Sequence, residues 1–79
     1  MELKIQYFGM IAEITNCNEE TLSILNDCKV NQLEVILKKK YHNLENISFK
    51  IVVDQKIPSS DIGIKPENEI ALLPPFSGG

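Results

Sequence analysis

The last six residues of the chain carry the pattern with the most direct chemical use: Pro74, Pro75, Phe76, Ser77, Gly78 and Gly79. The two prolines favour a stiff, extended conformation, and the phenylalanine offers one apolar anchor. Glycine has no Cβ, so the end fits a narrow channel and leaves the terminal carbonyl open to a nucleophile. Six extended residues reach roughly 20 Å. We therefore expect a globular domain over residues 1–75 and a flexible reactive tail over residues 76–79.

The carboxylate of Gly79 is the group that we expect to react. A carboxylate is a poor electrophile, but a partner enzyme with ATP can convert it to an acyl-adenylate, from which AMP leaves readily. An ionised sulfur nucleophile that displaces AMP leaves a thiocarboxylate, which can donate its sulfur in a second enzyme. These steps need no catalytic side chain in this chain, so we expect it to bind no cofactor and to use ATP only through the partner.

The chain has few other side chains that could act as nucleophiles or bind a metal ion. The chain has two cysteines, Cys17 and Cys28, and one histidine, His42. Two cysteines and one histidine far from them in the sequence do not supply the ligands of a typical zinc site. An iron–sulfur cluster held by cysteines needs four of them. We expect Cys17 and Cys28 to be reduced thiols.

The length and the net charge of the chain limit the classes of protein to which it can belong. A chain of 79 residues fits one domain. Its net charge of −3 argues against nucleic acid as a partner, and the basic run Lys38–Lys40 falls where a helix should end, which suits the helix dipole. No apolar stretch is long enough to span a membrane. We expect a cytoplasmic protein with no membrane or nucleic-acid partner.

The periodicity of the apolar residues predicts the order of elements. Alternation predicts strands over residues 2–7, 21–25 and 49–54, and the third of them is apolar enough to be central. An apolar run that ends at two prolines predicts the last strand, over residues 70–73. A short helix is expected over residues 10–15, and polar turns over residues 26–29 and 66–69. A short edge strand at residues 57–58 completes the prediction.

One main helix is expected after Asn31. This residue is a plausible N-cap with Glu34 three positions later, as in a capping box, and Val30 and Val35 have the spacing of a hydrophobic staple. The core stripe of this helix is Leu33, Leu37, Tyr41 and Leu44. The order of elements predicts an α+β fold, a ubiquitin-like β-grasp in which a mixed sheet packs on one main helix, with a short first helix. The first and last strands should then lie side by side at the centre.

The final strand is apolar on both faces, and one helix covers only one of them. Leu73 should therefore form an exposed apolar patch with Phe8 and Phe76, beside the point where Pro74 and Pro75 leave the sheet. Patches of this kind mark protein interfaces. We expect Phe8, Leu73 and the residues up to Ser77 to contact partner proteins.

The chain resembles the sulfur-carrier, or small, subunits of molybdopterin synthase, the MoaD-type β-grasp family. The resemblance covers essentially the full length and is carried by three blocks: residues 54–79, above all residues 72–79; residues 5–9 with Glu13; and the helix positions Val30, Leu33, Leu37 and Tyr41. The chain departs from the family pattern at four places, which are Ala12 for a usual arginine, Asn16 for glycine, Asp54 for asparagine and Phe76 for valine. Gly78 and Gly79 match it.

The resemblance implies a role in molybdenum cofactor biosynthesis and three kinds of partner. An E1-like adenylating enzyme would activate Gly79, and a sulfur-donor protein would supply the sulfur. The large catalytic subunit of molybdopterin synthase would bind the tail, which delivers sulfur to precursor Z. The family complex is a heterotetramer, so the chain would be the sulfur-donating subunit of an enzyme and no enzyme on its own.

Two other functions stay open. Sulfur carriers for thiamine synthesis share the fold and the terminal glycines, although they are usually shorter and lack both the short helix and this Pro-Pro; carriers for tRNA thiolation or cysteine synthesis are further members of this class. A ubiquitin-like modifier would use the same tail to form an isopeptide bond, and a plain interaction module would not use it. The mass of the chain after activation distinguishes a sulfur carrier from a modifier or an interaction module.

Overall fold

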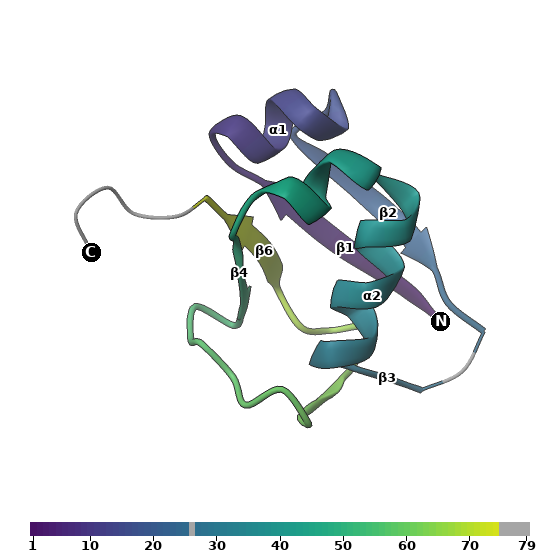
Figure 1. Ribbon diagram of the computed structural model, residues 1–79. Coiled ribbons are helices and arrows are strands. Elements are labelled where there is room, and N and C mark those ends of the chain that lie inside the picture. Colours follow the sequence, from purple (N-terminus) through teal and green to yellow (C-terminus); the bar gives the residue numbers. More distant parts are fainter. Residues whose placement is uncertain (26, 75–79) are drawn as a thin grey trace.

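The computed structural model describes residues 1–25 and 27–74. Its elements follow in this order: β1 (Glu2–Tyr7), α1 (Met10–Thr15), β2 (Glu19–Ser23), β3 (Cys28–Lys29), α2 (Val30–Lys40), the 3₁₀ helix η1 (His42–Asn46), β4 (Lys50–Val53), β5 (Gly63–Ile64) and β6 (Ile70–Leu73). In Figure 1, α2 and η1 lie over one face of the main sheet, and α1 follows the end of β1. The expected α+β, β-grasp arrangement with a short first helix is confirmed.

The main sheet has the strand order β2-β1-β6-β4. Strand β1 is antiparallel to β2 and parallel to β6, and β6 is antiparallel to β4. The first and last strands therefore lie side by side at the centre, as expected. The prediction that residues 49–54 form a central strand is wrong, because β4 is an edge strand. Val52 on its outer face stays half-buried, so a strand that is apolar on both faces need not have neighbours on both sides.

The core lies between the sheet and α2. Strand β1 buries every second residue, since side chains alternate between the faces of a strand. Helix α2 buries Leu33 and Leu37, and Leu44 is buried although the helix ends at Lys40 and the chain continues into η1. The side chains that are fully buried are Leu3, Ile5, Ile11, Leu33, Leu37, Leu44, Ile70 and Leu72.

The start of α2 differs from the sequence prediction. The helix begins at Val30 and not after Asn31, and the backbone N–H of Lys29 donates to Oε1 of Gln32 at 2.8 Å. Its first amides find acceptors in a distant loop, because the N–H groups of Val30 and Asn31 donate to the carbonyls of Ile62 and Ser60 at 3.0 and 2.9 Å. Val35 is 51% exposed, so it forms no hydrophobic staple.

Two short segments also differ. Strand β2 begins at Glu19, two residues earlier than predicted, because its register pairs Glu19 with Gln6 of β1. Within the predicted turn at residues 26–29, Asn26 lies outside the described residues, and Cys28–Lys29 form β3, which pairs with β5. Residues 57–58 lie outside the strands, so the predicted edge strand there is wrong.

Candidate functional site

The end of β6 is held beside the residue that follows β1. The N–H of Phe8 donates to the carbonyl of Leu72 at 3.3 Å, which extends the parallel pairing of the two central strands by one step. Pro74 comes after the last residue of β6 and cannot donate a backbone hydrogen bond, so the pairing ends there. The chain therefore leaves the sheet at its centre, next to Phe8.

Gly9 allows this close approach. Its φ is +56°, and a Cβ at this position would lie 3.1 Å from Cγ of Pro74, closer than ordinary van der Waals contact. Its ψ of −133° lies outside the left-handed helical region, in backbone space that only glycine adopts readily. Gly9 thus turns the chain from β1 into α1 and makes room for the proline at the end of β6.

A hollow of about 470 Å³ lies on the face of the sheet that α2 does not cover. We call it the exit hollow. Its apolar lining includes Phe8, Val52, Ile57, Ala71 and Leu73, and its polar lining is Gln6, Gln55 and Glu69. Phe8 is 45% and Ile57 66% exposed. The exit hollow is therefore an apolar surface with a partly polar border, at the place where β6 ends.

The structure brings together those expected site residues that it describes. Phe8 and Leu73 line the exit hollow, and Pro74 follows directly. The expected site residues Pro75, Phe76, Ser77, Gly78 and Gly79 lie outside the described residues. The boundary that we expect between the domain and its tail falls in the same segment. Partner binding by these residues stays a prediction.

Sequence reasoning missed three contributors to this site, Gly9, Val52 and Ile57. Val52 was assigned to a strand but not to the patch, and it reaches the hollow because β4 pairs with β6. Ile57 comes from a loop, for which no periodicity gives a direction. The signal for Gly9 is its place between a predicted strand and a predicted helix, where a sharp change of chain direction favours a residue without a Cβ.

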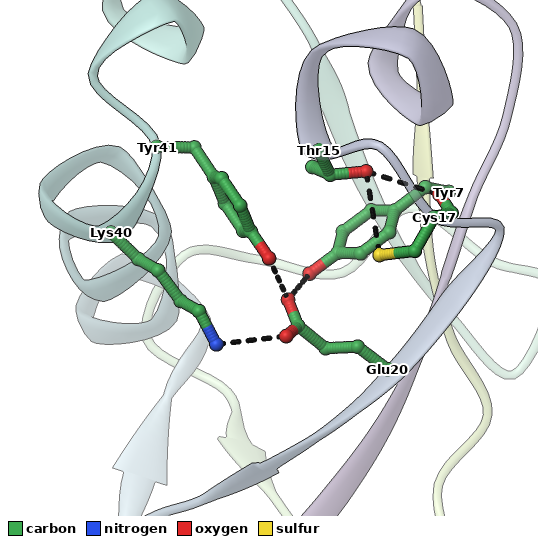
Figure 2. Close-up of polar contacts among 6 residues, drawn as sticks. All are labelled: Tyr7, Thr15, Cys17, Glu20, Lys40 and Tyr41. Carbon is green, nitrogen blue, oxygen red and sulfur yellow. Dashed lines mark hydrogen bonds and ion pairs between the residues drawn. The ribbon is translucent and has the colours of Figure 1, made fainter.

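A polar cluster joins β2 to the end of α2 (Figure 2). Oε1 of Glu20 accepts hydrogen bonds from the hydroxyls of Tyr7 and Tyr41, the latter at 2.7 Å, and its Oε2 lies 2.8 Å from Nζ of Lys40. The two tyrosine rings meet edge to face with centroids 6.2 Å apart. Beside them, Oγ1 of Thr15 donates to the carbonyl of Ile11 at 3.1 Å.

The electrostatics of the polar cluster favour a structural role. Burial opposes ionisation of Glu20, but hydrogen bonds from Lys40, Tyr7 and Tyr41 outweigh it and hold the pKa of its carboxyl below the usual value. Burial, followed by the hydrogen bond to Glu20, raises the pKa of Tyr7 and of Tyr41 above the ordinary phenol value. All three pKa values move away from neutrality, whereas a general acid or base works best with a pKa near the operating pH.

The cysteines are free thiols in different surroundings. Cys28 is buried, and burial raises the pKa of its thiol, which makes the reactive thiolate scarcer. Sγ of half-buried Cys17 lies 3.7 Å from Oγ1 of Thr15.

Across residues 1–25 and 27–74, no three histidine, cysteine, aspartate or glutamate side chains gather closely enough to hold a metal ion. Among these same residues, no helix is long and apolar enough to cross a membrane.

Comparison with known proteins gives a consistent result. The human molybdopterin synthase sulfur carrier subunit is 29% identical over 83 residues, which cover 99% of this chain and 94% of that protein. The structure of a Pyrococcus furiosus protein described as molybdopterin converting factor subunit 1 matches with a TM-score of 0.88, at 19% identity over 96% of this chain and 99% of that one.

A third similar protein carries another description. The solution structure of small archaeal modifier protein 1 from Methanosarcina acetivorans matches with a TM-score of 0.77, at 26% identity over 99% of this chain and 96% of that one. The sequence model of the ThiS family matches residues 5–79, which include the second half of β1, the whole of β6 and the terminal glycines. The chain therefore belongs to the ThiS family.

Proposed function

We propose that the chain is the sulfur carrier of molybdenum cofactor biosynthesis, the small subunit of molybdopterin synthase. The observation that carries this proposal is the place where the central strand β6 ends, beside an exposed apolar hollow and ahead of a sequence that finishes in Gly78-Gly79. The name of the human relative, a molybdopterin synthase sulfur carrier subunit, supports the same pathway.

The proposed reaction takes place at the carboxylate of Gly79. An oxygen of the carboxylate attacks the α-phosphorus of ATP bound to an E1-like enzyme, pyrophosphate leaves, and an acyl-adenylate forms. Sulfide, or its equivalent from a sulfur-donor protein, then attacks the carbonyl carbon. The bond to AMP breaks, and a thiocarboxylate remains. In the large subunit, the sulfur of the thiocarboxylate forms a bond to a carbon of precursor Z. Water then attacks the acyl carbon of Gly79, the bond between that carbon and the sulfur breaks, and the carboxylate returns for another cycle.

The exit hollow is the proposed docking surface for these partners. Phe8 supplies an exposed aromatic side chain, of the kind that tends to dominate interface energies. Because the hollow adjoins the end of β6, a protein that binds there also lies close to the start of the tail. The adenylating enzyme and the large subunit would use the same surface, so they must bind in turn. Two copies of the chain would take part in the heterotetramer.

A protein modifier is the second candidate. The observation in its favour is the 26% identity to small archaeal modifier protein 1 of Methanosarcina acetivorans. Such a modifier would use the same acyl-adenylate but would end in an isopeptide bond to a lysine. A sulfur carrier for thiamine synthesis or tRNA thiolation would form the same thiocarboxylate as the first candidate and differ only in the acceptor.

The first experiment measures the intact mass of the chain after incubation with an E1-like adenylating enzyme, ATP and sulfide. We expect the mass to rise by the difference between sulfur and oxygen, and we expect the charged chain to convert precursor Z to molybdopterin when the large subunit is added. A variant with one alanine added after Gly79 is the control, because it moves the carboxylate off the glycine.

The outcomes separate the candidates. A thiocarboxylate on the extended control would show that Gly79 is not the required terminus, and the proposed mechanism would be wrong. Formation of a thiocarboxylate without production of molybdopterin would assign the chain to another sulfur pathway. Attachment of the chain to lysines of other proteins, with no thiocarboxylate, would favour the modifier.

A further inference from the structure

The turn that follows β4 holds two left-handed residues in a row, Asp54 with a φ of +51° and Gln55 with a φ of +66°. The N–H of Val53 donates to the carbonyl of Lys56 at 2.9 Å, and the N–H of Lys56 donates to the carbonyl of Val53 at 3.0 Å. These bonds close a two-residue turn. Turns of this kind with a positive φ at both central residues strongly prefer asparagine or aspartate followed by glycine. The backbone at position 55 therefore favours glycine.

The other non-glycine residues with a positive φ suit their places in the fold. Among the residues that the structure describes, these are Asn16, the C-cap of α1, and Asp54. Asparagine and aspartate tolerate the left-handed conformation better than most residues. The carboxylate of Asp54 also accepts hydrogen bonds from Nδ2 of Asn68 and from the N–H of Glu69, both at 2.8 Å. The fold therefore accounts for the residue type at both positions.

No contact of this kind accounts for Gln55. Glutamine has a Cβ and lacks the short polar side chain with which asparagine and aspartate stabilise a left-handed backbone. Its side chain is exposed, and within the described part of the chain its carboxamide makes no hydrogen bond. Unfavourable backbone conformations cluster at functional surfaces, and Gln55 lines the exit hollow.

We propose that Gln55 is a binding residue of the exit hollow, and that its carboxamide forms hydrogen bonds with a backbone peptide group of the protein that docks there. The carboxamide has an acceptor oxygen and two donor hydrogens, so it can pair with both the N–H and the C=O of a peptide group. Apolar residues such as Ile57 and Val52 line the same hollow, so a docked protein would shield these bonds from water, which strengthens them. The inference rests on the proposed function, because it assigns a contact to the docking surface of the adenylating enzyme and the large subunit.

The first test variant is Gln55→Gly. Glycine adopts a positive φ without a steric penalty, so the melting temperature of the full chain should rise by about 4 °C. The variant also lacks the carboxamide, so calorimetric titration should show about fivefold weaker binding to both the adenylating enzyme and the large subunit. A gain in stability together with a loss of affinity distinguishes a residue that serves binding from one that serves the fold.

A second variant, Gln55→Ala, separates the effect of the side chain from that of the backbone. Alanine keeps the Cβ and the unfavourable conformation but lacks the carboxamide. We expect the same loss of affinity as in Gln55→Gly, without the gain in melting temperature. The matched control is Asn16→Gly, which replaces another left-handed residue with glycine at a position outside the exit hollow. Both affinities of this control should equal those of the wild type.

Three results would overturn the proposal: unchanged affinity of Gln55→Gly for either partner, wild-type affinity of Gln55→Ala, or a melting temperature of Gln55→Gly at or below that of the wild type. Each of them leaves the proposed function intact as long as the wild-type chain binds both partners and forms the thiocarboxylate. A wild-type chain that binds neither partner would instead rule out the exit hollow as a docking surface, and this inference with it.

Discussion

At the scale of single residues, Glu20 is the side chain on which the polar cluster depends. Its carboxylate accepts hydrogen bonds from Tyr7, Tyr41 and Lys40. Glu20→Gln keeps the shape but removes the charge, and hydrogen bonds to a charged group are worth about 1.5–3 kcal/mol. We expect the free energy of unfolding at about pH 7 to fall by about 1–2 kcal/mol, since Lys40 is partly exposed and its bond is screened.

The pH dependence of this effect follows from the pKa of Glu20. The folded pKa lies below the unfolded value of about 4.3, so the stabilisation is present above that value and is lost as the pH falls through the folded pKa. Urea unfolding at about pH 7 and about pH 3 should show the variant less stable than the wild type at pH 7, with a smaller difference between the two at pH 3. Glu13→Gln, at an exposed position of α1, is the matched control and should behave like the wild type at both.

At the scale of elements, the two faces of β6 have different roles: one packs into the core, and we expect the other to contact partner proteins. Leu72 is fully buried on the core face, whereas its neighbour Leu73 lines the exit hollow on the other face. We expect Leu73→Asp to keep a native circular dichroism spectrum and to weaken binding to both the adenylating enzyme and the large subunit by about 2–4 kcal/mol, because each complex would bury an unpaired charge. Calorimetric titration measures both affinities.

The matched control for the strand is Leu72→Asp, which puts the same charge one residue away. This variant should unfold, because the carboxylate would lie in the core. A folded Leu73→Asp with unchanged affinity for both partners would rule out the exit hollow as their docking surface. An unfolded Leu73→Asp would show that Leu73 belongs to the core.

At the scale of the whole molecule, the domain and the reactive end should be separable. Among the described residues, the buried hydrophobic side chains run from Leu3 to Leu72, so deletion of residues 77–79 removes none of them. We expect thermal melting to shift by less than about 4 °C, which corresponds to under about 1 kcal/mol for a domain of this size, while formation of the thiocarboxylate is abolished. Deletion from residue 72 onward removes a core leucine and should unfold the chain. A large loss of melting temperature in the shorter deletion would contradict the proposed separation.

The sequence by itself determined the elements whose pattern is local. Alternation along residues 2–7 predicted β1, the apolar run over residues 70–73 predicted β6, and helical spacing of Leu33 and Leu37 predicted α2. Asn16 follows α1 and adopts a left-handed conformation with φ of +62°, which asparagine tolerates better than most residues. These features depend on neighbours within one turn or one strand, so the chain carries their signal at short range.

Tertiary structure decided what depends on contacts between distant segments. The pairing of β3 with β5 joins two short strands that have no pattern of their own. The first two N–H groups of α2 donate to the carbonyls of Ile62 and Ser60, in a distant loop, and the expected cap at Asn31 did not mark the first residue of the helix. The exit hollow also combines separate segments. Periodicity shows which face of an element is apolar, but only the strand order shows which apolar face is left without a neighbour.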